Sequence, residues 1–295
     1  MTYAAVIGLL ALALAPGALA GTFPGRNGRI AYTQTVSGKP QIFTMDANGR
    51  GVTQVTREPN GASNPDWSAD GRSLAFDVGG TSIGVSDPNG GGVHLIGADA
   101  NLTDPSWSRD GSELVTTGIQ YGPQGNVEDE SVYLLHADGG GDQRIEDGNA
   151  PVWSPDGSWF LYTPTPATND FCGGVYAERP DGSDHHGIAP SYSDTGGGCT
   201  GGGSQASFSP DGRRVVFVAP NGRDLETASV HGGPPRRLRS DPSPKSTPIY
   251  SPDGRSILFV TGGPRPATAI VSAKRGGRER VIGPPVTEPA WQPLR

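Results

Sequence analysis

The sequence has 295 residues, a formal net charge of −7 at pH 7, 46 glycines and 28 prolines. An acidic chain has no general attraction to phosphate backbones or anionic membrane surfaces, so nucleic-acid binding is not expected. Glycine and proline recur between apolar runs, which predicts turns and argues against a disordered chain.

The first 20 residues have the pattern of a signal peptide. Ala4 to Ala15 is an unbroken run of small and apolar residues, and Ala18, Leu19 and Ala20 fit the small-x-small cleavage rule. The run is too short for a comfortable membrane span, and Gly21 stands where a lipoprotein would need cysteine. We therefore expect 1–20 to be a leader and 21–295 the exported domain, secreted or held in the periplasm or cell envelope without membrane insertion.

A repeat then occupies the rest of the chain. Residues 65–76 read PDWSADGRSLAF, and the same pattern returns at 105–116, 151–162, 206–217 and 248–259. Its aromatic positions are separated by 40 residues (Trp67 to Trp107) to 55 residues (Trp153 to Phe208). A period of this length is typical of a four-stranded propeller blade. The full aromatic series is Trp67, Trp107, Trp153, Phe208, Tyr250 and Trp291.

The two ends of the chain supply a sixth copy. Residues 27–32 (NGRIAY) match the second half of the repeat, and residues 288–293 (EPAWQP) match the first half. Six strand-and-turn segments also lie between the aromatic motifs, at 42–49, 83–90, 132–139, 175–182, 227–233 and 269–276. The sequence therefore predicts an all-β, six-bladed propeller of four-stranded blades, closed by pairing of the N- and C-terminal strands, which leaves no long sheet edge open.

Local residue chemistry agrees with short antiparallel hairpins. Asp-Gly and Asn-Gly provide the positive φ angles that tight turns need. The strand after each motif is apolar at consecutive positions, as in 215–217 (VVF), which predicts burial on both faces. The aromatic series is therefore expected to pack between blades as core.

Cys172 and Cys199 are the two cysteines of the chain. An even pair in an exported protein favours a disulfide, which would close the Gly-rich segment between them. Two free thiols are the alternative.

The motif W-S-P-D-G followed by an apolar strand resembles the TolB-type (PD40, WD40-like) propeller repeat over about residues 23–295. The resemblance implies the propeller architecture. It does not specify function, because the repeat occurs in binding proteins, in peptidases and in some carbohydrate-active enzymes. TolB carries an additional α/β domain and the peptidases an α/β-hydrolase domain; neither is seen here, so we expect neither TolB's own role in the Tol–Pal system nor peptidase activity.

Propellers usually bind at a mouth of the central channel, and the resemblance implies the same here. The residues just before each inner strand are expected to ring one mouth and to receive a peptide, a partner loop or a cation. They could equally be ordinary residues at the start of a strand. These candidates are Asn64, Asp104, Asn149 (beside Ala150), Gln205, Thr247 and Glu288.

Other motifs are weaker. Gly80 to Gly84 matches G-x-S-x-G, but Ser82 is expected to begin a strand and to lack the following helix. His185 and His186 are expected in a surface turn, with too few further ligands nearby for zinc. Asn101 begins a glycosylation sequon, meaningful only in a source that glycosylates this way. No metal or other cofactor is predicted.

Two functions remain open. The first is an exported, monomeric, non-catalytic binding protein that takes an envelope or extracellular protein or peptide at a channel mouth. The alternative is a propeller hydrolase or lyase that acts on a carbohydrate or lactone. Such enzymes usually gather His, Asp or Glu around a metal, and the predicted ring contains no histidine.

Overall fold

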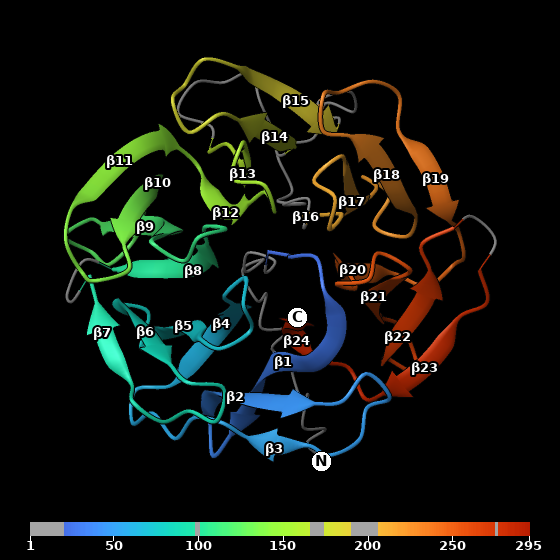
Figure 1. Ribbon diagram of the computed structural model, residues 1–295, viewed down its shortest axis with the longest axis horizontal. Coiled ribbons are helices and arrows are strands. Elements are labelled where there is room, and N and C mark those ends of the chain that lie inside the picture. Colours follow the sequence, from blue (N-terminus) through green and yellow to red (C-terminus); the bar gives the residue numbers. More distant parts are fainter. Residues whose placement is uncertain (1–20, 98–100, 166–173, 190–205, 275–276) are drawn as a thin grey trace, which may run out of the picture.

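A computed structural model describes residues 21–97, 101–165, 174–189, 206–274 and 277–295. Six four-stranded antiparallel sheets surround a central axis (Figure 1), so the predicted all-β, six-bladed propeller is confirmed. Blade 1 consists, from the axis outward, of β24 (Thr287–Leu294), β1 (Arg26–Val36), β2 (Lys39–Met45) and β3 (Thr53–Gln54).

The other five blades follow in chain order, each from its inner to its outer strand. They are blade 2, β4 (Ala62–Trp67), β5 (Leu74–Val78), β6 (Ser82–Ser86) and β7 (His94–Ile96); blade 3, β8 (Leu102–Trp107), β9 (Glu113–Tyr121), β10 (Val127–His136) and β11 (Asp142–Asp147); blade 4, β12 (Asn149–Trp153), β13 (Phe160–Thr163), β14 (Val175–Glu178) and β15 (His185–Ala189); blade 5, β16 (Ala206–Phe208), β17 (Arg214–Val218), β18 (Leu225–Ser229) and β19 (Arg236–Arg239); and blade 6, β20 (Lys245–Tyr250), β21 (Ser256–Thr261), β22 (Ala267–Ser272) and β23 (Arg280–Gly283).

The predicted closure between the chain ends is present in blade 1. β24 pairs antiparallel with β1, with Ile30 opposite Trp291 and Ala31 opposite Ala290. The last strand of the chain thus becomes the inner strand of the blade that the N-terminal strands begin. This pairing holds the ring together, because opening it would expose a row of unpaired backbone groups.

In blades 2 to 6, a repeated turn joins the inner strand to the strand that follows it. In blade 2, the Asp70 carboxylate accepts hydrogen bonds from the Ser68 hydroxyl (2.8 Å) and the Arg72 backbone N–H (3.0 Å), while Gly71 has φ 69°. Gly is suited to that conformation because it has no Cβ. Equivalent aspartates stand in four further blades, at Asp110, Asp156, Asp211 and Asp253.

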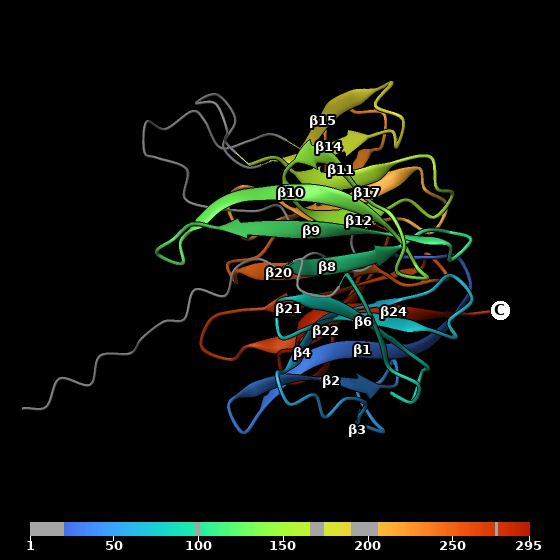
Figure 2. The same cartoon turned by 90° about the vertical axis from the view of Figure 1, so that its left-hand side faces the viewer.

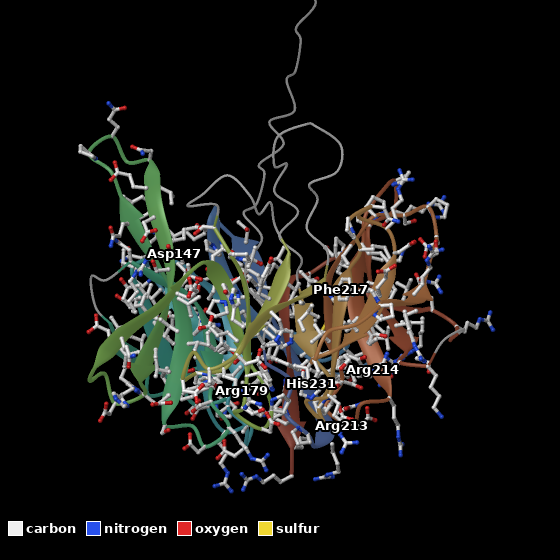
Figure 3. The ribbon with its side chains drawn as sticks, turned by 90° about the horizontal axis from the view of Figure 1, so that it is seen from above. Asp147, Arg179, Arg213, Arg214, Phe217 and His231 are labelled. Atoms are coloured by element: carbon white, nitrogen blue, oxygen red, sulfur yellow. The ribbon has the colours of Figure 1, made fainter. Side chains whose placement is uncertain are left out.

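The core lies between blades, as the sequence predicts. All six residues of the aromatic series are buried, and every residue of β5 is buried as well. Phe217, labelled in Figure 3, lies in a cluster with Phe208 and Leu161 that joins blades 4 and 5. These aromatic side chains are therefore packing residues.

The channel has two distinct ends. The inner strands β8 and β24 run toward the end at which the C-terminus lies (Figure 2). We call that end, which carries the Ser-x-Asp-Gly turns, the turn side, and the opposite end, where the inner strands begin, the start side. Figure 3 shows Arg213, which follows one such turn, toward the turn side and Asp147 toward the other.

Two expectations require comment. His185 and His186 were expected in a surface turn, but they open the outer strand β15, where the His185 ring bonds the Tyr162 hydroxyl at 3.0 Å. Cys172 and Cys199 lie outside the described residues, so the disulfide stays a prediction. Within the described part of the chain, no helix is long and apolar enough to cross a membrane.

Candidate functional site at the start-side mouth

The predicted ring residues do not precede the inner strands; they lie within them. Each stands at an irregularity in the pairing of an inner strand with its neighbour, where the register shifts, as between Ser63 and Asp66. The expectation was wrong by a few residues because the inner strands begin earlier than the aromatic motif suggests. The residues so placed are Asn64, Asp104, Ala150, Thr247 and Glu288. Gln205 lies outside the described residues.

All five share a left-handed backbone. Their φ angles are between 50° and 57°, a region that non-glycine residues rarely occupy. Proline follows each of them. Because proline has no N–H to contribute to the ladder, the irregularity loses no hydrogen bond there. The recurring bend is a built feature of the mouth, present at five blade positions of the described chain.

Asn149 has a different place from the one predicted for it. Ala150 occupies the repeating left-handed position, while Asn149 begins β12 and its side-chain amide donates to the Glu130 carboxylate. Asn149 therefore supports the hairpin of blade 3, and the ring position in blade 4 carries only a methyl group.

A side-chain oxygen of one blade accepts a hydrogen bond from the backbone N–H of the bend residue in the next blade. The Glu288 carboxylate of blade 1 accepts from Asn64 (2.9 Å), and the Asp77 carboxylate of blade 2 accepts from Asp104 (2.9 Å). The Thr117 hydroxyl of blade 3 accepts from Ala150 (2.9 Å). The bends are thereby locked to their neighbours around half of the ring.

Three carboxylates converge on Asn64. Its side-chain amide donates to Asp77 (2.6 Å) and to Asp104 (2.9 Å), and its backbone donates to Glu288. Asp77 and Asp104 are 3% and 8% exposed. Burial, with the negative charges of Asp104 and Glu288, raises the pKa of Asp77 well above its usual range. A cation at the mouth would therefore favour the ionised form of Asp77.

Neither Asp77 nor a second buried acid, Asp66, was a candidate from the sequence. A signal for both exists in the repeat itself. The position of Asp77 is otherwise filled by threonine or valine, as in Thr117 and Val260, and that of Asp66 by small or apolar residues, as in Ser106. In each case blade 2 has an acid at a position that the other copies keep uncharged.

A second hollow lies away from this mouth, on the turn side between blades 5 and 6. It has a volume of about 1120 Å³. Figure 3 shows the basic residue Arg214 toward that side. Its charged and aromatic lining includes Arg214, Arg236, Arg237, Tyr250, Asp253 and Lys274.

Neither a metal-binding cluster nor a nucleophile elbow is present in the described part of the chain. Among the described residues, no group of three or more His, Cys, Asp or Glu is arranged to hold a metal ion. Ser82 is buried at the start of β6 and is followed by a strand, as expected, so the G-x-S-x-G match lacks the helix that a nucleophile elbow needs.

This architecture defines the class of protein, a six-bladed β-propeller. Within this class, the chain is similar to TolB over part of its sequence. A curated TolB homologue of Chlorobium chlorochromatii is 31% identical over 136 residues, which is 44% of this chain and 29% of that protein. The chain thus matches less than a third of that relative's length.

Solved structures agree on the fold. TolB from Acinetobacter baumannii has a TM-score of 0.71 at 19% identity, over 90% of this chain and 67% of that one. An oligogalacturonate lyase in complex with manganese has a TM-score of 0.53 at 14% identity, over 85% and 88%. No protein-family model matches the sequence. At these identities the structural likeness concerns architecture.

Proposed function

We propose that this protein is an exported, non-catalytic binding propeller that receives a basic segment of another protein or peptide at the start-side mouth. The observation that carries the proposal is the convergence of Asp77, Asp104 and Glu288 on Asn64. Like charges are costly to hold together in a buried place unless a cation joins them. The likeness to TolB in the propeller supports a binding role over a catalytic one.

The burial of the cluster limits what can reach it. A lysine or arginine side chain has a long apolar stem and a charged end, so its charge can reach a carboxylate that lies below the surface. The side-chain carbonyl oxygen of Asn64 is buried and has no hydrogen-bond partner in the described part of the chain. It supplies a further acceptor for an ammonium or guanidinium group.

The leader pattern at 1–20 supports the place of action; the oligomeric state and the lack of a cofactor are further parts of the proposal. The mature protein acts in the cell envelope or outside the cell, as a monomer, and needs no cofactor. Its partner is a protein or peptide with exposed lysine or arginine.

The test is a cross-linking capture from envelope extract with three versions of the mature protein. The first is wild type, and the second carries Asp104→Asn and Glu288→Gln, which remove two charges but keep hydrogen-bond acceptors. The third is a charge-matched control, Asp142→Asn with Glu146→Gln, on the outer strand β11.

A partner captured by wild type and by the control, lost by the mouth variant and released by salt supports the proposal, because charge attraction is screened by ions. Equal capture by all three, or loss in the control as well, overturns the assignment of the site. An activity on an oligosaccharide that needs added manganese would favour the lyase alternative instead.

A further inference from the structure

The chain ahead of β1 runs inside the ring of inner strands (Figure 1). Thr22 and Phe23 are 2% and 1% exposed. The Thr22 hydroxyl bonds the Ser207 hydroxyl of blade 5 at 3.1 Å, while Phe23 packs in a cluster with Trp107 of blade 3. The backbone N–H of Gly25 then donates to the Pro252 carbonyl of blade 6 (3.1 Å). The segment 21–25 therefore crosses the channel and is held by blades on both sides.

Asp66 lies beside this segment and is completely buried. One of its carboxylate oxygens, Oδ2, accepts the backbone N–H of Trp107 at 2.9 Å. The other, Oδ1, has no hydrogen-bond partner in the described residues, and none of the ion pairs there includes Asp66. An ionised carboxylate in such a place is costly unless a positive group joins it.

Burial accordingly raises the pKa of Asp66 to about 8, although the hydrogen bond from Trp107 and the nearby polar groups of Ser106, Trp67 and Gly21 oppose the shift. Gly21 is close enough that a Cβ added to it would lie 3.6 Å from Oδ2 of Asp66 and 3.3 Å from the Ser106 hydroxyl. With residue 20 attached, the nitrogen of Gly21 is a neutral amide with one proton to donate.

We infer that the mature chain begins at Gly21 and that its α-ammonium group pairs with the Asp66 carboxylate inside the channel, fixing the N-terminus across it. The inference rests on the proposed leader at 1–20. Hydrolysis of the bond between Ala20 and Gly21 by a leader peptidase consumes one water and leaves a carboxylate on Ala20 and an ammonium on Gly21. That ammonium has three protons to donate, and its positive charge supplies the partner that the Asp66 carboxylate lacks.

Gly21 also fits the position sterically. It is buried, so a chain that starts at Gly21 brings no further residue into the space beside Asp66. Cleavage would therefore convert a buried, unpaired acid into an ion pair. The folded domain would gain stability only after export and processing.

The test compares chains that start at Gly21 with chains that start at Ala20, each as wild type and as Asp66→Asn. The asparagine keeps an acceptor for the Trp107 N–H and removes the charge. We expect Asp66→Asn to lower the urea midpoint of the Gly21 chain and to leave that of the Ala20 chain unchanged or raised. Equal effects in the two chains overturn the pairing.

A second measurement needs no variant. The Gly21 amine of the folded wild type should react with an amine-selective reagent at pH 8 about tenfold or more slowly than the same amine in urea, because labelling requires local opening. Labelling at the unfolded rate refutes the pairing. The intact mass of the exported protein separates the proposed cleavage site from the proposed ion pair. If the first residue is not Gly21, both are refuted. If it is Gly21 but the amine is labelled at the unfolded rate, the ion pair alone is refuted. Capture by Asp104 and Glu288 is unaffected by either result.

Discussion

The left-handed bends at the start-side mouth can be tested by a single change, Ala150→Gly. Ala150 has φ 54° and is half-buried. An L-residue in this region costs roughly 1–2 kcal/mol, which glycine avoids. Glycine loses roughly 0.5–1 kcal/mol more backbone entropy on folding than alanine. The two terms nearly offset, and we expect Ala150→Gly to be neutral or to stabilise by up to about 1 kcal/mol.

The matched control is Ala267→Gly, a half-buried alanine in β22 that is not among the residues with positive φ. It should destabilise by about 1 kcal/mol, because it incurs the entropy cost with no strain to relieve. Urea unfolding of both variants, with unchanged m-values, measures the difference. If Ala150→Gly destabilises as much as Ala267→Gly, the bend is unstrained and the reasoning fails.

Three further outcomes concern the turns, the closure and the channel. Hydrogen bonds from Ser112 and Ser108 lower the pKa of Asp110. The stability that ionised Asp110 contributes is therefore present above the unfolded pKa and is lost as pH falls through the lower folded pKa. In urea titrations, Asp110→Ala should cost about 1 kcal/mol at pH 7 and much less at pH 2. Trp291→Ala removes the ring that packs against Ile30 and Ile249 at the closure, and should cost about 3–5 kcal/mol by the same assay. In a chain that keeps Ala20, the raised pKa of Asp66 means that its carboxyl stays protonated in the folded state at a pH where it has ionised in the unfolded state. The free energy of unfolding should therefore fall as pH rises from about 4 to about 8. The ceiling of the Asp66 contribution is roughly 6 kcal/mol. Asp66→Asn should remove that contribution and leave the one from Asp77, whose pKa is also raised; a wild type with flat stability over this range contradicts the assignment.

The fold could be predicted in detail because it depends on local patterns repeated many times. The aromatic series and the Asp-Gly turns each appear in nearly every blade, and the halves at 27–32 and 288–293 predict the closure that β1 and β24 form. A copy that departs from the pattern does not obscure the repeat, because the other copies still show it. The failures concern strand limits, as at Asn64, which was expected just before an inner strand that in fact begins at Ala62.

The candidate site could be predicted only in part. Asn64, Asp104 and Glu288 were candidates by position, but Asp77 was not. The contacts among the four form only in the ring, because Asn64 and Asp77 belong to blade 2, Asp104 to blade 3 and Glu288 to blade 1. Asp66 was missed because its role depends on Gly21, which lies 45 positions earlier and reaches it by crossing the channel.

The sequence by itself therefore determined the number of blades, their turns and their closure, since these depend on hydrophobic pattern and turn chemistry within about 40 residues. Only the tertiary structure decided which acids share a buried space and what crosses the channel. Burial and charge proximity set the pKa values and the need for a positive partner, and both arise from residues that are distant in the chain and close in the ring.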